Sequence, residues 1–272
     1  MSIGIINQEM AAEFGPLPPG RMIFVIPMAG ESRRFHDAGY SQPKFRLAAH
    51  GVPVFDYAVN SFAAYFRSDT FLFVLRGADA ADFVRQRCRG LGIERADVVT
   101  LDAPTAGQAE TVLLGLDAAN IDDAESIAVF NIDTFRPGYR KPPQIADAGC
   151  GGYLEVFRGE GANWSFVAPH PDRRGEVASV AEKKPISDLC CTGLYYFRRA
   201  GDFRWAYRNP APPCSEAERR ERYVAPLYNA LIGRGDRIAL ELVDASDVVF
   251  CGTPSEYEHV LASEEIGRRL RP

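Results

Sequence analysis

The sequence predicts an α/β protein with a Rossmann-like, mostly parallel central sheet that is flanked by helices. Three continuous apolar runs, at residues 22–26, 70–75 and 126–132, are typical of strands that are buried on both faces. Helical patterns stand between these runs, and this alternation is typical of parallel β-α-β units. The second half of the chain contains strand-like runs joined by loops, which indicates a mixed or antiparallel extension of the sheet.

The elements of the first half are placed by hydrophobic periodicity and turn residues. Pro53 marks a helix start, because proline is favoured in the first helical turn, and the apolar residues that follow it lie on or near one face. The remaining elements are expected to be a strand at 70–75, a helix at 79–91, a short strand at 98–99, a helix at 108–118 and a strand at 126–132.

The second half is expected to add four strands before it returns to helices. The chain is expected to form a tail over residues 1–20 and one domain over 21–272, with halves 21–145 and 146–272. The expected elements are strands at 153–157, 164–168, 177–181 and 190–197, helices at 199–208 and 216–233, a strand pair within 237–251 and a last helix over 255–269.

Composition and charge exclude several kinds of partner. The chain has 272 residues, a net charge of −5 and 46% hydrophobic residues, which suits a globular protein but not one that coats nucleic acid or anionic membrane. No apolar run is long enough to span a bilayer, and the six cysteines form no CxxC pair. We therefore expect free thiols, a reducing compartment and a cytoplasmic location. The sequence leaves both a monomer and a homodimer open.

The loop after the first strand has the features of an anion site. It contains Gly30, which lets the backbone approach a ligand closely, and three nearby cations at Arg33, Arg34 and Lys44. Ligands of α/β sheets bind at the carboxyl ends of parallel strands. The loop matches neither GxxxxGK[ST] nor GxGxxG, which disfavours P-loop and dinucleotide-binding enzymes. An ordinary strand-to-helix turn with solvated arginines also fits this segment alone.

Two further segments place polar groups at the same edge of the predicted sheet. Gly107 and Gln108 open a helix, where backbone amides and one side-chain amide can meet a polar ring edge. Asp133 ends the third strong strand, and Mg²⁺ prefers a few carboxylates together with phosphate oxygens. A solvated glutamine and a turn-capping aspartate would fit the same two segments without a ligand.

In their order along the chain, these segments resemble the signature of the sugar-phosphate nucleotidyltransferases and their smaller, capsular-biosynthesis and cytidylyltransferase-like members. The matching residues include Met28-Ala29-Gly30, Arg34-Phe35, Pro43-Lys44, Glu182-Lys183 and the strand at 190–197 with its Thr192-Gly193, and the likeness runs from about residue 22 to residue 262.

The resemblance implies a role for each matched residue. Arg34, Lys44 and Asp133 would be catalytic, with Asp133 as the Mg²⁺ ligand. The nucleotide would be bound by Met28, Ala29, Gly30, Gly107 and Gln108, and the acceptor by Glu182, Lys183, Gly193 and Tyr223. The first half of the domain would then bind the nucleotide and the second half the acceptor.

The sequence departs from the family pattern at two places. Ser32 stands where a second glycine is usual, and Phe250 stands two residues before Gly252-Thr253-Pro254, where many relatives have a second metal-binding carboxylate. Asp247, three residues earlier, is the substitute candidate.

The implied reaction transfers a nucleoside monophosphate from CTP or UTP to a small phosphorylated acceptor, with Mg²⁺ as cofactor. The acceptor is expected to be a sugar phosphate, in the synthesis of surface polysaccharide or lipid precursors. A phosphocholine-, aminophosphonate- or phosphoglutamine-like acceptor is an alternative, and the aromatic segments 195–197 and 223–228 could enclose an ammonium group or form core. The sequence also leaves open a glycosyltransferase of similar fold and a non-catalytic nucleotide sensor.

Overall fold

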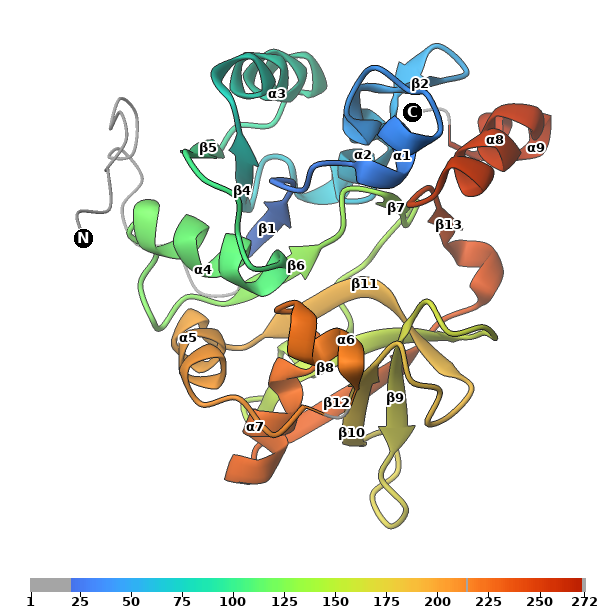
Figure 1. Cartoon of the computed structure of the whole chain (residues 1–272). Helices are drawn as coiled ribbons and strands as arrows, with labels where there is room; N and C mark the ends of the chain where they lie inside the picture. The colour runs from blue at the N-terminus through green and yellow to red at the C-terminus, as the bar shows by residue number, and fades with distance from the viewer. Residues whose placement is uncertain (1–20, 214, 271–272) are drawn as a thin grey trace.

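The protein is described by a computed structural model over residues 21–213 and 215–270, so the predicted tail at 1–20 lies outside the described residues. Within these ranges the main sheet has nine strands (Figure 1). Its strands are β1 (Ile23–Pro27), β4 (Thr70–Arg76), β5 (Ala96–Leu101), β6 (Ile127–Phe130), β8 (Cys150–Arg158), β9 (Ser165–Pro169), β10 (Val177–Glu182), β11 (Leu189–Phe197) and β12 (Arg237–Leu242). Two small pairs accompany it, β2 (Ala48–Ala49) with β3 (Val52–Pro53) and β7 (Thr134–Phe135) with β13 (Val249–Phe250).

The parallel part of the sheet is built from the apolar runs that the sequence shows. Strand β1 lies between β4 and β6, parallel to both, and Val25 is in register with Leu72 and Val129. Strand β5 continues the parallel order beyond β4. All five residues of β1 are buried, which explains why its sequence shows no polar alternation.

The second half extends the same sheet with antiparallel pairs, as the sequence predicts. Strand β11 runs antiparallel to β6, β8 and β9, and β10 runs antiparallel to β9. Strand β12 pairs in parallel with β8 at the far side. Because β6 and β11 are hydrogen-bonded neighbours, the two halves of the chain share one continuous sheet.

Helices cover both faces of the sheet. One face packs its phenylalanines, such as Phe24 and Phe73, against α2 and α3, while the other packs Val25 and Leu72 against α4, α5 and α7. Figure 1 shows α3 above the parallel strands and α5 with α7 at the opposite end. The helices are α1 (Arg33–Asp37), α2 (Val54–Asn60), α3 (Ala78–Leu91), α4 (Gln108–Ala118), α5 (Ala200–Arg208), α6 (Glu216–Arg220), α7 (Leu227–Arg234), α8 (Pro254–Ala262) and α9 (Glu264–Arg269), with 3-10 turns η1 (Lys44–Arg46), η2 (Ala63–Tyr65), η3 (Pro143–Ile145) and η4 (Ala245–Asp247).

Three predicted elements of the second half are corrected by the structure. The predicted helix at 216–233 is two helices, α6 and α7, because the chain is extended at Glu221 and Pro226 starts α7. The last helix is divided into α8 and α9 at Ser263, whose extended backbone and hydroxyl cap α9. The predicted strand pair within 237–251 is wrong, since β12 pairs with β8 whereas β13 pairs with β7.

The last helices return to the first half of the chain. Helix α8 begins with a capping box between Thr253 and Glu256, and the Tyr257 hydroxyl donates a hydrogen bond of 2.8 Å to the Ala48 carbonyl. Figure 1 shows α8 and α9 beside β2. This return places Gly252 next to the end of β6. Of the described helices, none has the length and apolar character needed to cross a bilayer.

Candidate active site

A cleft of about 900 Å³ opens at the carboxyl ends of β1 and β6 and is also lined by residues of β9, β10 and β11. Its position is the one expected for ligands of open α/β sheets. All of the predicted site residues except Gly193 line it. They are Met28, Ala29, Gly30, Arg34, Lys44, Gly107, Gln108, Asp133, Glu182, Lys183 and Tyr223.

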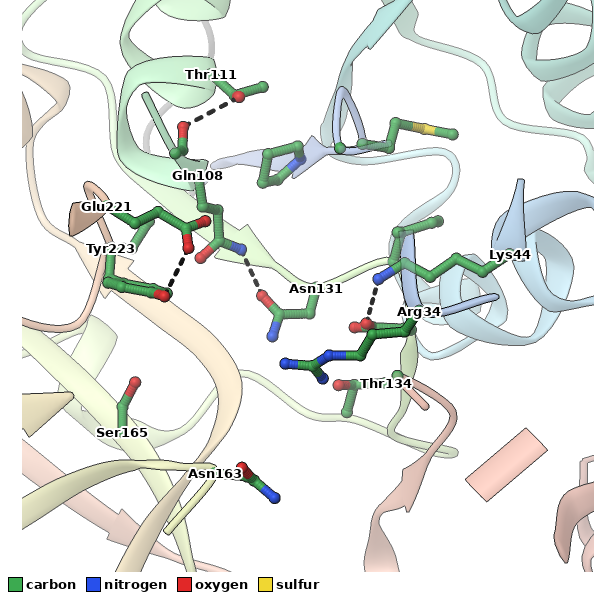
Figure 2. Close-up of a pocket in the computed structure, with 18 of the residues that line it drawn as sticks. Arg34, Lys44, Gln108, Thr111, Asn131, Thr134, Asn163, Ser165, Glu221 and Tyr223 are labelled. Atoms are coloured by element: carbon green, nitrogen blue, oxygen red, sulfur yellow. Dashed lines mark hydrogen bonds and ion pairs between the residues drawn. The ribbon is translucent and has the colours of Figure 1, made fainter. Parts of the chain in front are cut away.

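The loop after β1 brings its cations to one end of the cleft. Buried Phe35 anchors the short helix α1, while the preceding Arg34 is exposed and reaches into the cleft toward Asn131 (Figure 2). Arg33 instead pairs with Glu31 at 2.9 Å, with its side chain 83% exposed. Arg34 is therefore available to a ligand in the cleft, whereas Arg33 has a partner within its own loop.

Lys44 and Asp133 form an ion pair at the same end. The Lys44 Nζ atom lies 2.5 Å from Asp133 Oδ2, and both side chains keep a minor exposed fraction. Gly252 lies against this pair, because a Cβ atom there would stand 2.9 Å from Asp133 Oδ2. Two residues that are 89 positions apart in the sequence thus meet beside the loop that carries Arg34.

The start of α4 is held against the second half of the chain. The Arg222 backbone accepts a hydrogen bond from Ala109 N (2.9 Å) and donates one to the Ala106 carbonyl (2.8 Å). Gly107 fits between them with φ of 142°, and a Cβ there would stand 2.5 Å from the Arg222 oxygen. We call this pair of hydrogen bonds the Arg222 contact. It brings Gln108 and its neighbours to the same cleft as Tyr223.

The opposite end of the cleft carries Glu182 and Lys183. Ser165 donates its hydroxyl hydrogen bond to the buried Glu182 carboxylate, and burial raises the pKa of Glu182. Lys183 has a left-handed backbone with φ of 53°, a strained conformation for a residue with a side chain. Its ammonium donates to the Tyr223 hydroxyl at 2.7 Å, and that hydroxyl donates to Glu221 at 2.6 Å. Figure 2 shows Tyr223 and Glu221 facing the cleft from the side opposite Arg34.

Gly193 lies behind the cleft wall. Its φ is 99°, and a Cβ there would stand 2.6 Å from the Asn131 side-chain nitrogen. Its carbonyl also accepts a hydrogen bond from Asn131 N at 3.1 Å. The missing side chain of Gly193 therefore makes room for Asn131.

Comparisons with known proteins identify the family. A nucleoside-diphosphate-sugar pyrophosphorylase from Vibrio cholerae RC9 is 51% identical, covers 89% of this chain and 100% of its own, and superposes with a TM-score of 0.83. This chain belongs to the sugar-phosphate nucleotidyltransferases. It is thus an enzyme of the pyrophosphorylase type, as the sequence predicts, and neither the glycosyltransferase nor the sensor hypothesis is retained.

More distant structures share the fold of this nucleotidyltransferase. The inositol-1-phosphate CTP transferase from T. maritima is 11% identical with a TM-score of 0.67, over 92% of this chain and 95% of its own. A UDP-glucose pyrophosphorylase complexed with UDP-glucose is 16% identical with a TM-score of 0.69, over 89% of this chain and 97% of its own. No family model matches the sequence, and no curated protein matches it.

The donor set of the nucleotidyltransferase fits Mg²⁺ through one protein carboxylate. Among the described residues, no group of three or more His, Cys, Asp or Glu side chains could enclose a metal. Asp247, the substitute candidate, is absent from the cleft lining and lies 4.0 Å from Arg136. Mg²⁺ commonly uses one or two carboxylates, waters and substrate phosphates, so a single carboxylate in the cleft, such as that of Asp133, fits the way this ion is bound.

Several cleft residues of the nucleotidyltransferase were not singled out from the sequence. Trp164 lines the cleft and packs on Phe250, whose position the sequence did single out, with ring centroids 4.6 Å apart. Ser165 was missed because its partner Glu182 is 17 positions away. Asn131 could have been found, because it precedes Asp133 by two residues at a strand end, where alternate residues tend to point the same way.

The aromatic residues of the two predicted segments divide between core and cleft. Tyr196, Phe197 and Tyr228 are buried in the core and absent from the cleft lining, whereas Tyr195 and Tyr223 line it. A complete ammonium cage from these segments is therefore excluded.

Five of the six cysteines are described and all five are free and buried, as expected, whereas Cys214 lies outside the described residues.

Proposed function

We propose that the enzyme transfers a nucleoside monophosphate from CTP or UTP to a sugar phosphate or a similar small phosphorylated metabolite, with Mg²⁺, and releases pyrophosphate. The product would be an activated precursor for surface polysaccharide, such as capsule, or for lipid. One observation carries the proposal: the cleft has Arg34 and the Lys44–Asp133 pair at one end and Glu182 with Lys183 at the other. A triphosphate and a second phosphorylated substrate would each meet cations there.

The reaction requires no general base. A phosphate oxygen of the acceptor, already ionised near neutral pH, attacks the α-phosphorus of the NTP, and the bond from this phosphorus to the pyrophosphate oxygen breaks. Arg34 and Lys44 stabilise the negative charge that develops on the leaving pyrophosphate. Bound Mg²⁺, held by Asp133, would supply further neutralisation of the phosphate oxygens. Lys183 orients the acceptor phosphate, and Glu182 accepts hydrogen bonds from acceptor hydroxyls.

Lys44 is expected to change partner during the catalytic cycle. In the described structure its ammonium pairs with Asp133, which a metal ion would also need as a ligand. Because both would compete for one carboxylate, arrival of the metal and nucleotide would free Lys44 for the triphosphate. The ion pair thus keeps both charges partnered within the protein.

A pyrophosphate-release screen tests the proposal. Five nucleotides (ATP, GTP, CTP, UTP and dTTP) are each paired with sugar 1-phosphates, phosphocholine, 2-aminoethylphosphonate and phosphorylated amides. We expect release only with Mg²⁺ and only for CTP or UTP with a sugar phosphate. The proposal fails if no pair releases pyrophosphate above the rate without acceptor, or if a purine nucleotide is preferred.

A second acceptor class is favoured by one feature of the cleft. Trp164 and Phe250 present tilted aromatic rings to the cleft, and exposed Glu160 lines it nearby. Aromatic faces with a carboxylate are suited to an ammonium group. Pyrophosphate release with phosphocholine or an aminophosphonate in the same screen would select this class instead of the sugar phosphates.

A further inference from the structure

Asn131 is the residue at which the predicted nucleotide and acceptor sites touch. It follows strand β6, and its side-chain Oδ1 accepts a hydrogen bond of 2.5 Å from Gln108 Nε2. On its other side, its backbone and its Nδ2 atom lie against Gly193 of β11. Figure 2 shows the amides of Gln108 and Asn131 joined in the middle of the cleft.

The close approach of Gly193 restricts the Asn131 amide to a narrow space. A Cβ at residue 193 would lie 2.6 Å from Nδ2 and 2.9 Å from the side-chain carbon Cγ of Asn131, both shorter than a van der Waals contact. The glycine backbone therefore supports the amide from behind, while Gln108 holds it from the front. A side chain held on two sides loses little further rotamer freedom when a ligand binds.

The hydrogen bond between the two amides determines which of their atoms remain for a ligand. Gln108 uses its nitrogen toward Asn131, so its Oε1 remains as an acceptor. Among the described residues, Asn131 Nδ2 has no hydrogen-bond partner within the protein, and both side chains line the cleft. The pair consequently offers one acceptor and one donor, between the start of α4 and the Lys44–Asp133 ion pair.

We propose that Asn131 is a nucleotide-positioning residue: it holds Gln108 so that Oε1 accepts a hydrogen bond from an N–H of the nucleobase. Its own Nδ2 donates to an oxygen of the transferred nucleoside monophosphate. This inference rests on the proposed function. In it, the Gln108–Asn131 pair positions the α-phosphate relative to the acceptor.

Steady-state kinetics on Asn131→Ala test the inference. We expect the KM for the preferred NTP to rise about tenfold, equivalent to about 1.4 kcal/mol, while the KM for the acceptor changes less than about twofold. Asn131→Asp keeps an oxygen for Gln108 but lacks the donor, so it should raise the NTP KM while the choice between CTP and UTP is retained. Asn209→Ala, which removes an exposed amide at the end of α5, is the matched control and should match wild type.

A double mutant separates positioning from a purely structural role. If Asn131 acts partly through Gln108, the Gln108→Ala/Asn131→Ala enzyme should lose less than the sum of the two single losses. Thermal unfolding of each variant shows whether the fold is kept. An unchanged NTP KM in a folded Asn131→Ala enzyme would overturn the inference, as would a rise confined to the acceptor KM.

Nucleotide binding by calorimetry distinguishes failure of the inference from failure of the proposed function. If wild type releases no pyrophosphate with any acceptor but binds CTP or UTP with Mg²⁺, the proposed reaction is wrong. Weaker nucleotide binding by Asn131→Ala than by Asn209→Ala would then still support the positioning role. Equal binding by the two variants would refute it, whatever reaction the enzyme performs.

Discussion

Substitution of Gly107 by alanine should disrupt the junction between the proposed nucleotide and acceptor sites. The new Cβ would stand 2.5 Å from the Arg222 oxygen and 2.7 Å from the Arg222 nitrogen, so the Arg222 contact cannot persist as it is. Its two backbone hydrogen bonds are worth about 0.5–1.5 kcal/mol each. The backbone of Gly107, with φ of 142° and ψ of −178°, lies in a region used almost only by glycine, and alanine there costs about 1–3 kcal/mol.

Together these effects predict that Gly107→Ala lowers the free energy of unfolding by about 2–6 kcal/mol. Urea denaturation measures this loss, and hydrogen exchange at the Ala109 and Arg222 amides shows whether it arises at the contact. The KM for the NTP should rise as well, because Gln108 follows Gly107 directly.

A matched glycine provides the control. Gly90 lies exposed in α3, and no atom is within 4 Å of a Cβ built there. Gly90→Ala should therefore raise the free energy of unfolding by about 0.5–1 kcal/mol. If Gly107→Ala were as stable as wild type, with unchanged amide exchange at Ala109 and Arg222, the assigned steric and strain effects would be refuted.

Three further predictions concern the charges and the aromatic wall of the cleft. Lys44→Met and Asp133→Asn should each lower the rate of pyrophosphate release by about 10²–10³-fold with the fold retained, and near-normal turnover in either would remove that residue from catalysis. Because burial raises the pKa of Glu182, the folded protein holds the carboxyl proton more tightly than the unfolded chain does, so wild type should lose stability relative to Glu182→Gln as pH rises through that raised pKa. Urea denaturation at about pH 4 and about pH 8 measures the stability of wild type relative to each variant. This relative stability should change between the two pH values for Glu182→Gln but not for exposed Glu258→Gln. An equal value at both pH values for Glu182→Gln would contradict the burial argument. Phe250→Asp restores the carboxylate that the family pattern has and should strengthen Mn²⁺ binding in paramagnetic resonance titrations, whereas unchanged Mn²⁺ affinity would show that this position cannot reach the metal.

The parallel half of the fold could be predicted from the sequence because its signals are local. Helix α4 has the bounds that its pattern predicts, and β1, β4 and β6 coincide with apolar runs that only a strand buried on both faces explains. The helix breaks of the second half also had local signals. Pro226 and Ser263 are residues that start helices, but the apolar periodicity on both sides concealed them.

Strand partners could not be predicted in the same way. The segment at 237–251 contains two strands, and their closeness in sequence favours a hairpin. Strand β12 instead continues the main sheet beside β8, and β13 pairs with β7 next to Asp133. Pairing depends on which buried surfaces meet in three dimensions, and neither strand carries that information in its own residues.

The candidate site was predictable as a set of residues but not as a set of contacts. The residues at strand and helix ends share one cleft because sheet topology brings those ends together. The partner of each side chain depends on approaches across the cleft. Gly193 was expected to give room to the acceptor, but it is not among the residues that line the cleft, and its bare backbone lies against Asn131.

Ser32 in the loop after β1 illustrates how such a contact can compensate for a departure from the family pattern. Ser32 has φ of 53° and ψ of 33°, the left-handed conformation that glycine adopts without strain, and which costs other residues about 1–2 kcal/mol. Its hydroxyl oxygen accepts a hydrogen bond of 3.3 Å from Lys44 N, and a bond of this kind contributes about 0.5–1.5 kcal/mol. The two energies are similar, so serine is tolerated where glycine is usual. Glycine could not make this hydrogen bond, and the bond ties the loop to the residue whose ammonium pairs with Asp133. The departure from the family pattern therefore retains the loop conformation and adds a constraint on the position of Lys44.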